Sequence, residues 1–378
     1  MKKNTLQRFF FFWTKPDIFF YALLWLMVLV VLGTVSQKYI GLYQAQHTYF
    51  SSFYFWLGPV PLPGGYTTLG VVSVNLLAKF IFASPWHWKK AGTIITHFGV
   101  LLLLLGGLLT SITSKEGSML IYEGAESGHF DDYHAKELIV YTLDESGGEH
   151  KVVSYAWNQT EVGNVLTVPK AGFSLEILKR CRNCNAVNRE NPEADPQYAQ
   201  LQGRARKFDI EPIPPEKDNE KNKSGMFFRI TGAGEKDGIH FSVDFIESAP
   251  FVEVNGVTYY IALRRARTYL PFNIRLIDFQ KEYYPGTDIP HHYRSEVVVE
   301  EGDTEWRSLI QMNEPLRYRG YTFYQSSFID NGRQQATVLA VVRNGGRMFP
   351  YIASITMCIG LLVHMVLYLP RLIQRRVT

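Results

Sequence analysis

The chain has 378 residues, of which 46% are hydrophobic and 20% are charged, and its formal net charge is +4. A positive excess this small and this dispersed argues against a protein that holds nucleic acid on a basic surface. Its three cysteines are too few for a disulfide-stapled scaffold. The mean composition hides two populations: residues 1–113 and 350–378 are strongly apolar, whereas residues 114–349 are polar.

Four apolar segments predict membrane-spanning helices, because each is close to the ~20 residues needed to cross a bilayer. We expect them at about residues 18–35, 66–83, 91–110 and 350–369. The third segment is the clearest, since no Asp, Glu, Lys or Arg lies between Lys90 and Lys115. The first is too long for a signal peptide and is expected to be an uncleaved anchor.

Basic residues occur in three places: before the first segment, at Lys89 and Lys90 between the second and third, and after the fourth. The positive-inside rule assigns all three places to the cytoplasm. The sequence therefore predicts cytoplasmic N- and C-termini in a bacterial inner membrane. Residues 114–349 would then form an extracytoplasmic, periplasmic domain between helices three and four.

This domain is expected to be mostly β. Short β-prone runs such as KELIVYTL and IHFSVDFI recur through it, separated by Gly, Pro, Asn and Asp. That pattern is typical of an antiparallel sandwich or open barrel. Residues 185–224 differ, because they are rich in charge, Pro and Asn, and they are predicted to form a mobile insertion that buries little apolar surface.

One titratable side chain, His97, interrupts the third apolar segment. An ionisable group at that depth is costly, and by default it indicates a function. The small residues at 92, 96, 99, 106 and 110 fall on one helix face that suits close packing, and His97 points about 140° away from Gly92. The leading interpretation is a haem-iron ligand. The structural alternative is an imidazole hydrogen-bonded to a neighbouring helix.

His364 lies in the fourth segment, six residues before Pro370. This spacing places it about 9 Å from the cytoplasmic side, the depth also expected of His97. Two histidines at one depth could ligate a single haem from its two faces, or their depths could match by chance.

Cys181 and Cys184 form the motif CRNC, and no histidine follows, so this is not a haem-attachment motif. The pair could form a local disulfide, act in redox chemistry or provide half of a metal site, and a disulfide is the favoured interpretation. Cys358, in the fourth segment, is expected to be a small apolar filler.

Other histidines are weaker candidates for a ligand role. His291 and His292 follow a Pro-rich turn, and His47 lies in the loop after the first apolar segment. The simplest interpretation is that all three lie at the surface. No nucleophile elbow, P-loop, dinucleotide fingerprint or HExxH motif occurs, so no catalytic residue and no resident metal site are predicted.

Several stretches together resemble the ResB (CcsB) family of system II cytochrome c biogenesis proteins. One is GPVPLPGGYTTLGVVSVNLLAK, leading into the second helix, and another is THFGVLLLLLGGLLTS, with its histidine. In the outer domain, DFQKEYYPGTDIPHHYRSEVVV is followed by MNEPLRYRGYTFYQSSF. The order of three helices, a large outer domain and a fourth helix also matches.

The resemblance implies that the chain handles haem b, held transiently and shared with a ResC/CcsA-like partner that carries a tryptophan-rich WWD loop. The pair would present haem at the outer face for attachment to the CxxCH motif of apocytochrome c. His97 matches the family's haem-binding histidine, whose counterpart ligand comes from the partner. The chain would be the non-catalytic or co-catalytic half of a cytochrome c synthetase. A thioredoxin-like thiol reductant is a further candidate partner.

Two other classes of function remain open at this stage. A b-type electron-transfer subunit would use His97 and His364 as the axial ligands of one haem. A sensor or scaffold would bind a ligand through its outer β domain and would hold no haem.

Overall fold

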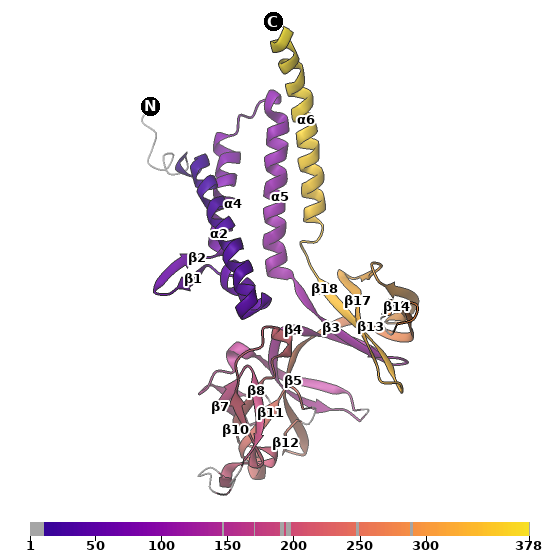
Figure 1. The fold of residues 1–378 in the computed structure, drawn as a ribbon. Coiled ribbons are helices and arrows are strands. Elements are labelled where there is room, and N and C mark those ends of the chain that lie inside the picture. Colours follow the sequence, from indigo (N-terminus) through magenta and orange to yellow (C-terminus); the bar gives the residue numbers. More distant parts are fainter. Residues whose placement is uncertain are drawn as a thin grey trace. The chain divides into compact units, whose positions relative to one another are not determined.

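The computed structural model describes residues 11–145, 147–169, 171–189, 193, 198–246, 249–287 and 290–377. The chain forms two compact units, which we describe separately (Figure 1). A helical unit contains Met1–Lys115, Tyr318–Tyr321 and Val342–Thr378, and a β-rich unit contains Glu116–Arg317 and Thr322–Val341. The basic residues predicted to flank the first helix at positions 2, 3 and 8, and the side chains of residues 370–377, lie outside the described part.

Four helices in the helical unit are long and apolar enough to cross a membrane, which confirms the prediction of four such helices. They are α2 (Pro16–Ile40), α4 (Gly65–Ala78), α5 (Ala91–Thr113) and α6 (Phe349–Val377). A π-helical turn, Lys79–Ala83, continues α4. Helix α2 begins at a proline, which suits the first turn, and ends at Gly41, whose φ of 81° a residue with a side chain would rarely adopt.

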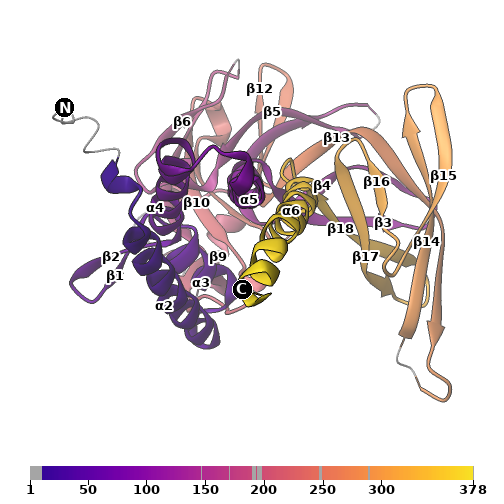
Figure 2. The same ribbon diagram turned by 90° about the horizontal axis from the view of Figure 1, so that it is seen from above.

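Helices α5 and α6 lie side by side and meet along a seam of small residues (Figures 1 and 2). Gly92, Gly99 and Gly106 are buried and recur every seven residues on α5. A Cβ atom at Gly92 would collide with the backbone of His364, and one at Gly106 with the side chain of Phe349. The small-residue face expected from the sequence is therefore the surface on which α6 packs.

Helices α2 and α4 form the second pair (Figure 2). The Asn75 side-chain amide of α4 donates to the Lys15 carbonyl at 2.9 Å, and the Trp25 indole of α2 donates to the Pro63 carbonyl at 2.9 Å. Between the two helices the chain forms a short helix, a π turn and a hairpin. These are α3 (Leu42–Ala45), Gln46–Phe50, β1 (Tyr54–Leu57) and β2 (Val60–Pro63).

The β-rich unit is built on two main sheets, which confirms the prediction of a large β-rich domain. The larger sheet has the order β15-β14-β13-β4-β3-β18-β17-β16, and in addition β5 pairs with β4 and β12 pairs with β13. The smaller sheet has the order β11-β10-β7-β6. The strands of the larger sheet are β3 (Lys115–Tyr122), β4 (Glu126–Leu143), β5 (Glu149–Ala156), β12 (Phe251–Val254), β13 (Val257–Tyr283), β14 (Pro290–Glu301), β15 (Thr304–Gln311), β16 (Leu316–Tyr318), β17 (Tyr321–Asp330) and β18 (Gln335–Arg343). Those of the smaller are β6 (Val165–Thr167), β7 (Ser174–Cys181), β10 (Gly225–Thr231) and β11 (Gly238–Val243).

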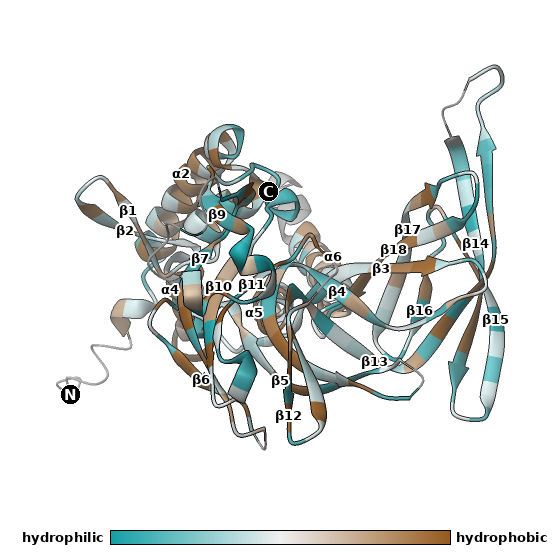
Figure 3. Cartoon of the chain, turned by 90° about the horizontal axis from the view of Figure 1, so that it is seen from below, coloured by the Kyte–Doolittle hydropathy of each residue, from teal (hydrophilic) through white to brown (hydrophobic). Residues whose placement is uncertain are grey.

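The two sheets share one apolar core. Leu138 and Ile261 from β4 and β13 join Ile177 and Phe228 from β7 and β10 in a single buried cluster. This is the arrangement of a sandwich, in which the inward side chains of two sheets interdigitate. Figure 3 shows the contrast in hydropathy within the molecule, with α2 largely brown and β15 mostly teal.

Strand β13 is longer than the sequence suggests, because two expected strands, 257–263 and 272–279, merge into it. Its first half pairs with β4 and its second half with β14, from Asn273 onward. Pairing with β4 is interrupted between Tyr269 and Ile274. Pro271 lies in this interruption, where its missing N–H breaks no ladder hydrogen bond.

The segment 185–224, predicted as a mobile insertion, contains regular structure in its described part. Strands β8 (Cys184–Asn188) and β9 (Phe208–Pro212) form a hairpin. Leu201, Ala205 and Ile210 are buried in an apolar cluster with residues of β10 and β11. The polar composition hid these few apolar positions, so the segment buries more surface than we expected. Residues 190–192 and 194–197 lie outside the description.

Candidate functional site

His97 lies on α5 one turn after Thr93, and its Nδ1 atom is 2.7 Å from the Thr93 carbonyl oxygen. Because a carbonyl can only accept, Nδ1 must carry the hydrogen of this bond. The neutral ring then keeps the lone pair of Nε2 free. A backbone carbonyl that fixes the tautomer in this way is the usual support of a metal-ligating histidine.

His364 of α6 approaches the same residue. Its Nδ1 atom is 3.5 Å from the Thr93 hydroxyl, and its ring stacks on Tyr368 with the ring centroids 5.5 Å apart. Thr93 therefore contacts both candidate histidines, one through its carbonyl and the other through its hydroxyl. The sequence places His97 and His364 at the same depth, and in the structure both contact Thr93.

The packing of α5 on α6 restricts what the two imidazoles can hold together. At this level the helices meet backbone to backbone, since a Cβ at Gly92 would collide with His364, and one at Gly360 with Thr96. A porphyrin plate cannot enter a seam this close. The two histidines consequently cannot clamp one haem between α5 and α6.

The outer faces of the helices are apolar and exposed in this chain. Leu108 and Ile112 of α5 are 56% and 71% exposed, and Leu362 of α6 is 62% exposed. His97 itself is half-buried. Such surfaces suit contact with lipid or with the helices of another protein.

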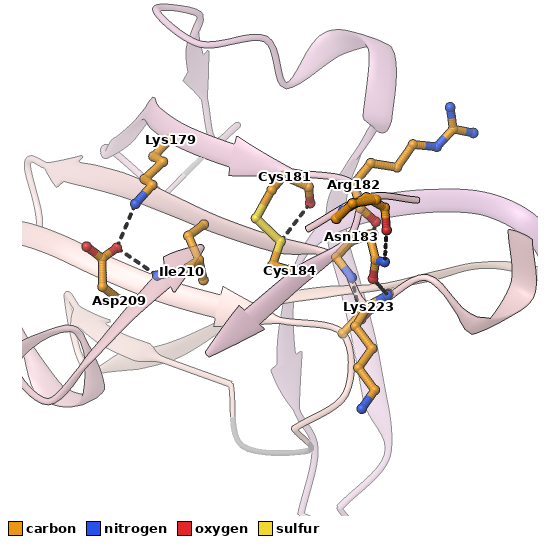
Figure 4. The surroundings of a disulfide bond; sticks show 11 residues. Lys179, Cys181, Arg182, Asn183, Cys184, Asp209, Ile210 and Lys223 are labelled. Carbon is orange, nitrogen blue, oxygen red and sulfur yellow. Dashed lines mark hydrogen bonds and ion pairs between the residues drawn. A yellow bond between two sulfur atoms is a disulfide. The ribbon is translucent and has the colours of Figure 1, made fainter. Parts of the chain in front are cut away.

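Cys181 and Cys184 form a disulfide at the end of β7 (Figure 4). Cys181 is 7% exposed and Cys184 is fully buried. Backbone and side-chain hydrogen bonds hold the intervening turn, in which Asn183 donates to the Pro214 carbonyl at 2.8 Å and the Cys184 N–H donates to the Lys223 carbonyl at 2.7 Å. A bond this enclosed suits a structural role, because thiol exchange requires access to a sulfur.

Beside the disulfide, the Asp209 carboxylate accepts from the Lys179 ammonium at 2.9 Å (Figure 4). Burial alone would raise the pKa of Asp209, but the hydrogen bonds from Lys179 and the Ile210 N–H outweigh it, and the pKa lies below its ordinary value. The carboxylate therefore stays charged and ties β9 to β7.

The weaker histidine candidates lie at the surface. His291 is exposed at the start of β14, with its ring 5.0 Å from that of Tyr284, and His47 is exposed in the π turn, 4.5 Å from Tyr43. Within the described residues, no group of three or more His, Cys, Asp and Glu side chains could hold a metal ion.

The two outer-domain motifs that carry the resemblance lie against each other. The Ser295 hydroxyl donates to the Gln325 carbonyl oxygen at 2.7 Å, and the Gln325 amide donates to the Thr337 hydroxyl at 2.8 Å. The Ser295 and Thr337 oxygens are 2.9 Å apart, which closes a buried polar triad. Nearby, Lys281 pairs with Asp330, an interaction that raises the pKa of Lys281. These contacts join β14 to β17 and β18.

A cluster of arginines on β13 was missed in the sequence analysis. Arg264 bonds Glu137 at 3.0 Å and Glu149 at 2.6 Å, and Arg267 bonds Glu149 at 2.7 Å and Asp131 at 3.2 Å. The available signal was the run RRAR inside a β-prone stretch, since arginines are seldom placed in a central strand without partners. These ion pairs line a cavity in the β-rich unit.

Four helices long and apolar enough to cross a membrane, together with a large β-rich unit, indicate a membrane protein. Residues 253–337, from the end of β12 to the start of β18, match the model of the ResB-like family. A segment of 65 residues is 40% identical to the cytochrome c biogenesis protein CcsB of Picosynechococcus, and covers 17% of this chain and 14% of CcsB. Over these segments the chain is similar to the ResB-like family and to a cytochrome c biogenesis protein.

A longer alignment relates the chain to protein NrfI of Wolinella succinogenes. It is 24% identical over 298 residues, and covers 78% of this chain and 29% of NrfI. The chain therefore spans less than a third of the length of NrfI.

Proposed function

We propose that this chain is the haem-handling subunit of a system II cytochrome c maturation complex. The observation that carries the proposal is His97, whose Nδ1 hydrogen is committed to the Thr93 carbonyl and whose Nε2 is left free. A neutral imidazole held in this way suits haem iron. In a chain with this similarity to the ResB-like family, haem b is best treated as cargo that His97 holds transiently.

The second axial ligand of that haem would come from another protein. His364 is the nearest candidate in this chain, but the closed seam at Gly92 excludes a porphyrin from the space between α5 and α6. A ResC/CcsA-like membrane protein with a WWD loop would supply the other imidazole and the outer haem-handling surface. The exposed apolar faces of α5 and α6 are suitable for its helices.

Apocytochrome c would be the acceptor of the haem at the outer face. The described residues of this chain offer no constellation for the attachment chemistry, so the chain would act as one half of the synthetase. The buried disulfide gives no support to a thioredoxin-like reductant as a partner. This function requires α2, α4, α5 and α6 to cross the bacterial inner membrane, with both termini in the cytoplasm and the β-rich unit outside.

The experiment compares the complex with its WWD partner in three forms: unchanged, His97→Ala and His364→Ala. We expect the first to contain haem, visible as a Soret band, and to support cytochrome c maturation. His97→Ala should lose both, whereas His364→Ala, on the opposite helix of the seam, should keep most of both. Equal haem content and equal maturation in the unchanged and His97→Ala complexes would refute the proposal.

A b-type electron-transfer subunit is the second candidate, favoured by the contact of both histidines with Thr93. It requires α5 and α6 to separate and predicts a redox-active haem in this chain without any partner. Loss of that signal in both His97→Ala and His364→Ala would support it. A Soret band that survives His364→Ala would exclude it.

A further inference from the structure

The β-rich unit contains a charged cavity of about 550 Å³, and the proposed haem site does not use it. We call it the arginine cavity. Strands β4, β5, β11 and β13 contribute to its wall, and its charged lining residues are Asp131, Glu149, Asp244, Arg264, Arg265 and Arg267.

Two arginines of β13 converge on one acceptor beside an irregularity of β4. Arg265 pairs with Lys136 but Arg267 pairs with Asp131, so the extra residues of this register shift lie in β4. Beside it, the guanidiniums of Arg264 and Arg267 both bond the same oxygen, Oε2 of Glu149, at 2.6 and 2.7 Å.

Glu149 is the acceptor that the two arginines share, and it is more exposed than either of them. It is the first residue of β5, and its side chain is 32% exposed, compared with 13% for Arg264 and 24% for Arg267; Asp131, at 39%, is the other accessible carboxylate of the cluster. The arginines are also held from behind, because the Nε atom of Arg264 bonds Glu137 and that of Arg267 bonds Asp131. Removing Glu149 would therefore leave two oriented guanidiniums facing the cavity.

One donor of this group has no acceptor among the residues that the structure describes. Nη2 of Arg264 is buried, and no hydrogen-bond partner contacts it. A guanidinium presents paired N–H groups that match the two oxygens of a carboxylate, but Glu149 engages the fork through a single oxygen. A carboxylate that entered in place of Glu149 could accept from Nη1 and Nη2 together, and this would satisfy the buried donor.

We propose that the arginine cavity binds the carboxylate group of a ligand, and that Glu149 occupies this position until the ligand displaces it. The inference rests on the geometry of Arg264, Arg267 and Glu149 and does not depend on His97. Two carriers of the carboxylate fit the chemistry: a propionate of a porphyrin, or an acidic side chain of a peptide.

The test measures binding of two probes to the full chain in detergent. The first probe is deuteroporphyrin IX, which has two propionates and no metal, so that His97 cannot ligate it, and its dimethyl ester is the control for partition into micelles. The second is a hexaglutamate peptide, with hexaglutamine as its control. Each probe is titrated into the unchanged chain, Glu149→Gln, Arg267→Gln and Glu161→Gln. Glu161 is the matched control, because it is 65% exposed, pairs with Arg180 and lies outside the cavity lining.

We expect Glu149→Gln to bind one of the acidic probes at least about tenfold more tightly. The probe's carboxylate would no longer compete with the Glu149 carboxylate for its charge-assisted hydrogen bonds to the arginines. Arg267→Gln should weaken the same binding, Arg267→Lys should restore it only in part, and Glu161→Gln should leave it unchanged. The probe that responds identifies the carrier. A gain of affinity in Glu149→Gln cannot arise from misfolding. If Glu149→Gln fails to tighten binding of either acidic probe over its neutral control, the proposal is wrong.

Discussion

The helical unit and the β-rich unit are held together by different means. Helices α5 and α6 meet through glycines that allow backbone contact, as Gly92 does against His364. In the β-rich unit, ion pairs such as Lys281–Asp330 and the arginine cluster on β13 connect strands that are distant in sequence. A lipid-exposed helix gains little from burying charge, so close packing dominates there, whereas partly solvated charges are tolerated in the β-rich unit.

The largest effect is expected where the glycine seam is filled. Gly106→Leu places a side chain where Phe349 already lies, whereas Gly107→Leu, one position along, meets nothing within 4 Å. Overpacking costs about 1–3 kcal/mol, and here it should also separate α5 from α6. We expect a lower yield of monodisperse protein and a lower Tm for Gly106→Leu alone. Equal behaviour of the two variants would mean that the seam does not hold the helices.

The second-largest effect is expected on the stability of the β-rich unit when its disulfide is removed. Replacing both Cys181 and Cys184 by Ser should lower the free energy of unfolding by about 2 kcal/mol, the value for so short a loop. Chemical denaturation of the β-rich unit, monitored by circular dichroism, measures this. Cys358→Ser is the control, since Cys358 is unpaired and exposed. Equal denaturation midpoints for the double serine variant and the unchanged chain would contradict the prediction.

The helical unit was largely predictable from its sequence, and its connections were not. Apolar segments set the starts of the four helices to within about two residues, because span length and composition are local properties, whereas α6 continues to Val377. The β1–β2 hairpin was missed because the loop around it is aromatic and Pro-rich without regular alternation. The contact of Thr93 with both His97 and His364 depends on how α5 crosses α6, which no local pattern specifies.

In the β-rich unit, the strands were predictable and their pairing was not. Hydrophobic alternation marks individual strands, but the two roles of β13 depend on a register shift and on Pro271 lying in an unpaired stretch. The cavity was missed for the same reason. Arg264 and Arg267 meet at Glu149, which comes from another strand, and the register shift beside them lies in β4.

The polar triad offers a smaller effect, specific to the segments that match the ResB-like family. Thr337→Val removes the nearer of the two acceptors of the Gln325 amide and leaves the Ser327 carbonyl at 3.3 Å, which should cost about 1 kcal/mol. Adding Ser295→Ala should cost less than the sum of the two single changes, because the residues share one network. A double-mutant cycle from denaturant titrations measures this coupling. Strict additivity would mean that the triad does not act as a unit.

The smallest effect is a pH dependence confined to the β-rich unit. Burial lowers the pKa of His240, which is 4% exposed, below its ordinary value of 6.5, and burial followed by the charge of Arg267 does the same for His129. The unfolded chain therefore takes up protons first as the pH falls through 6.5, so stability is full above that pH and declines below it, by at most about 1.4 kcal/mol per pH unit for each histidine. His240→Phe should flatten this decline, while His150→Gln, at an exposed position, should leave it intact. Because α5 and α6 pack through glycines, the stability of their seam should not follow this decline, and a steeper acid response there than in the β-rich unit would reverse the comparison.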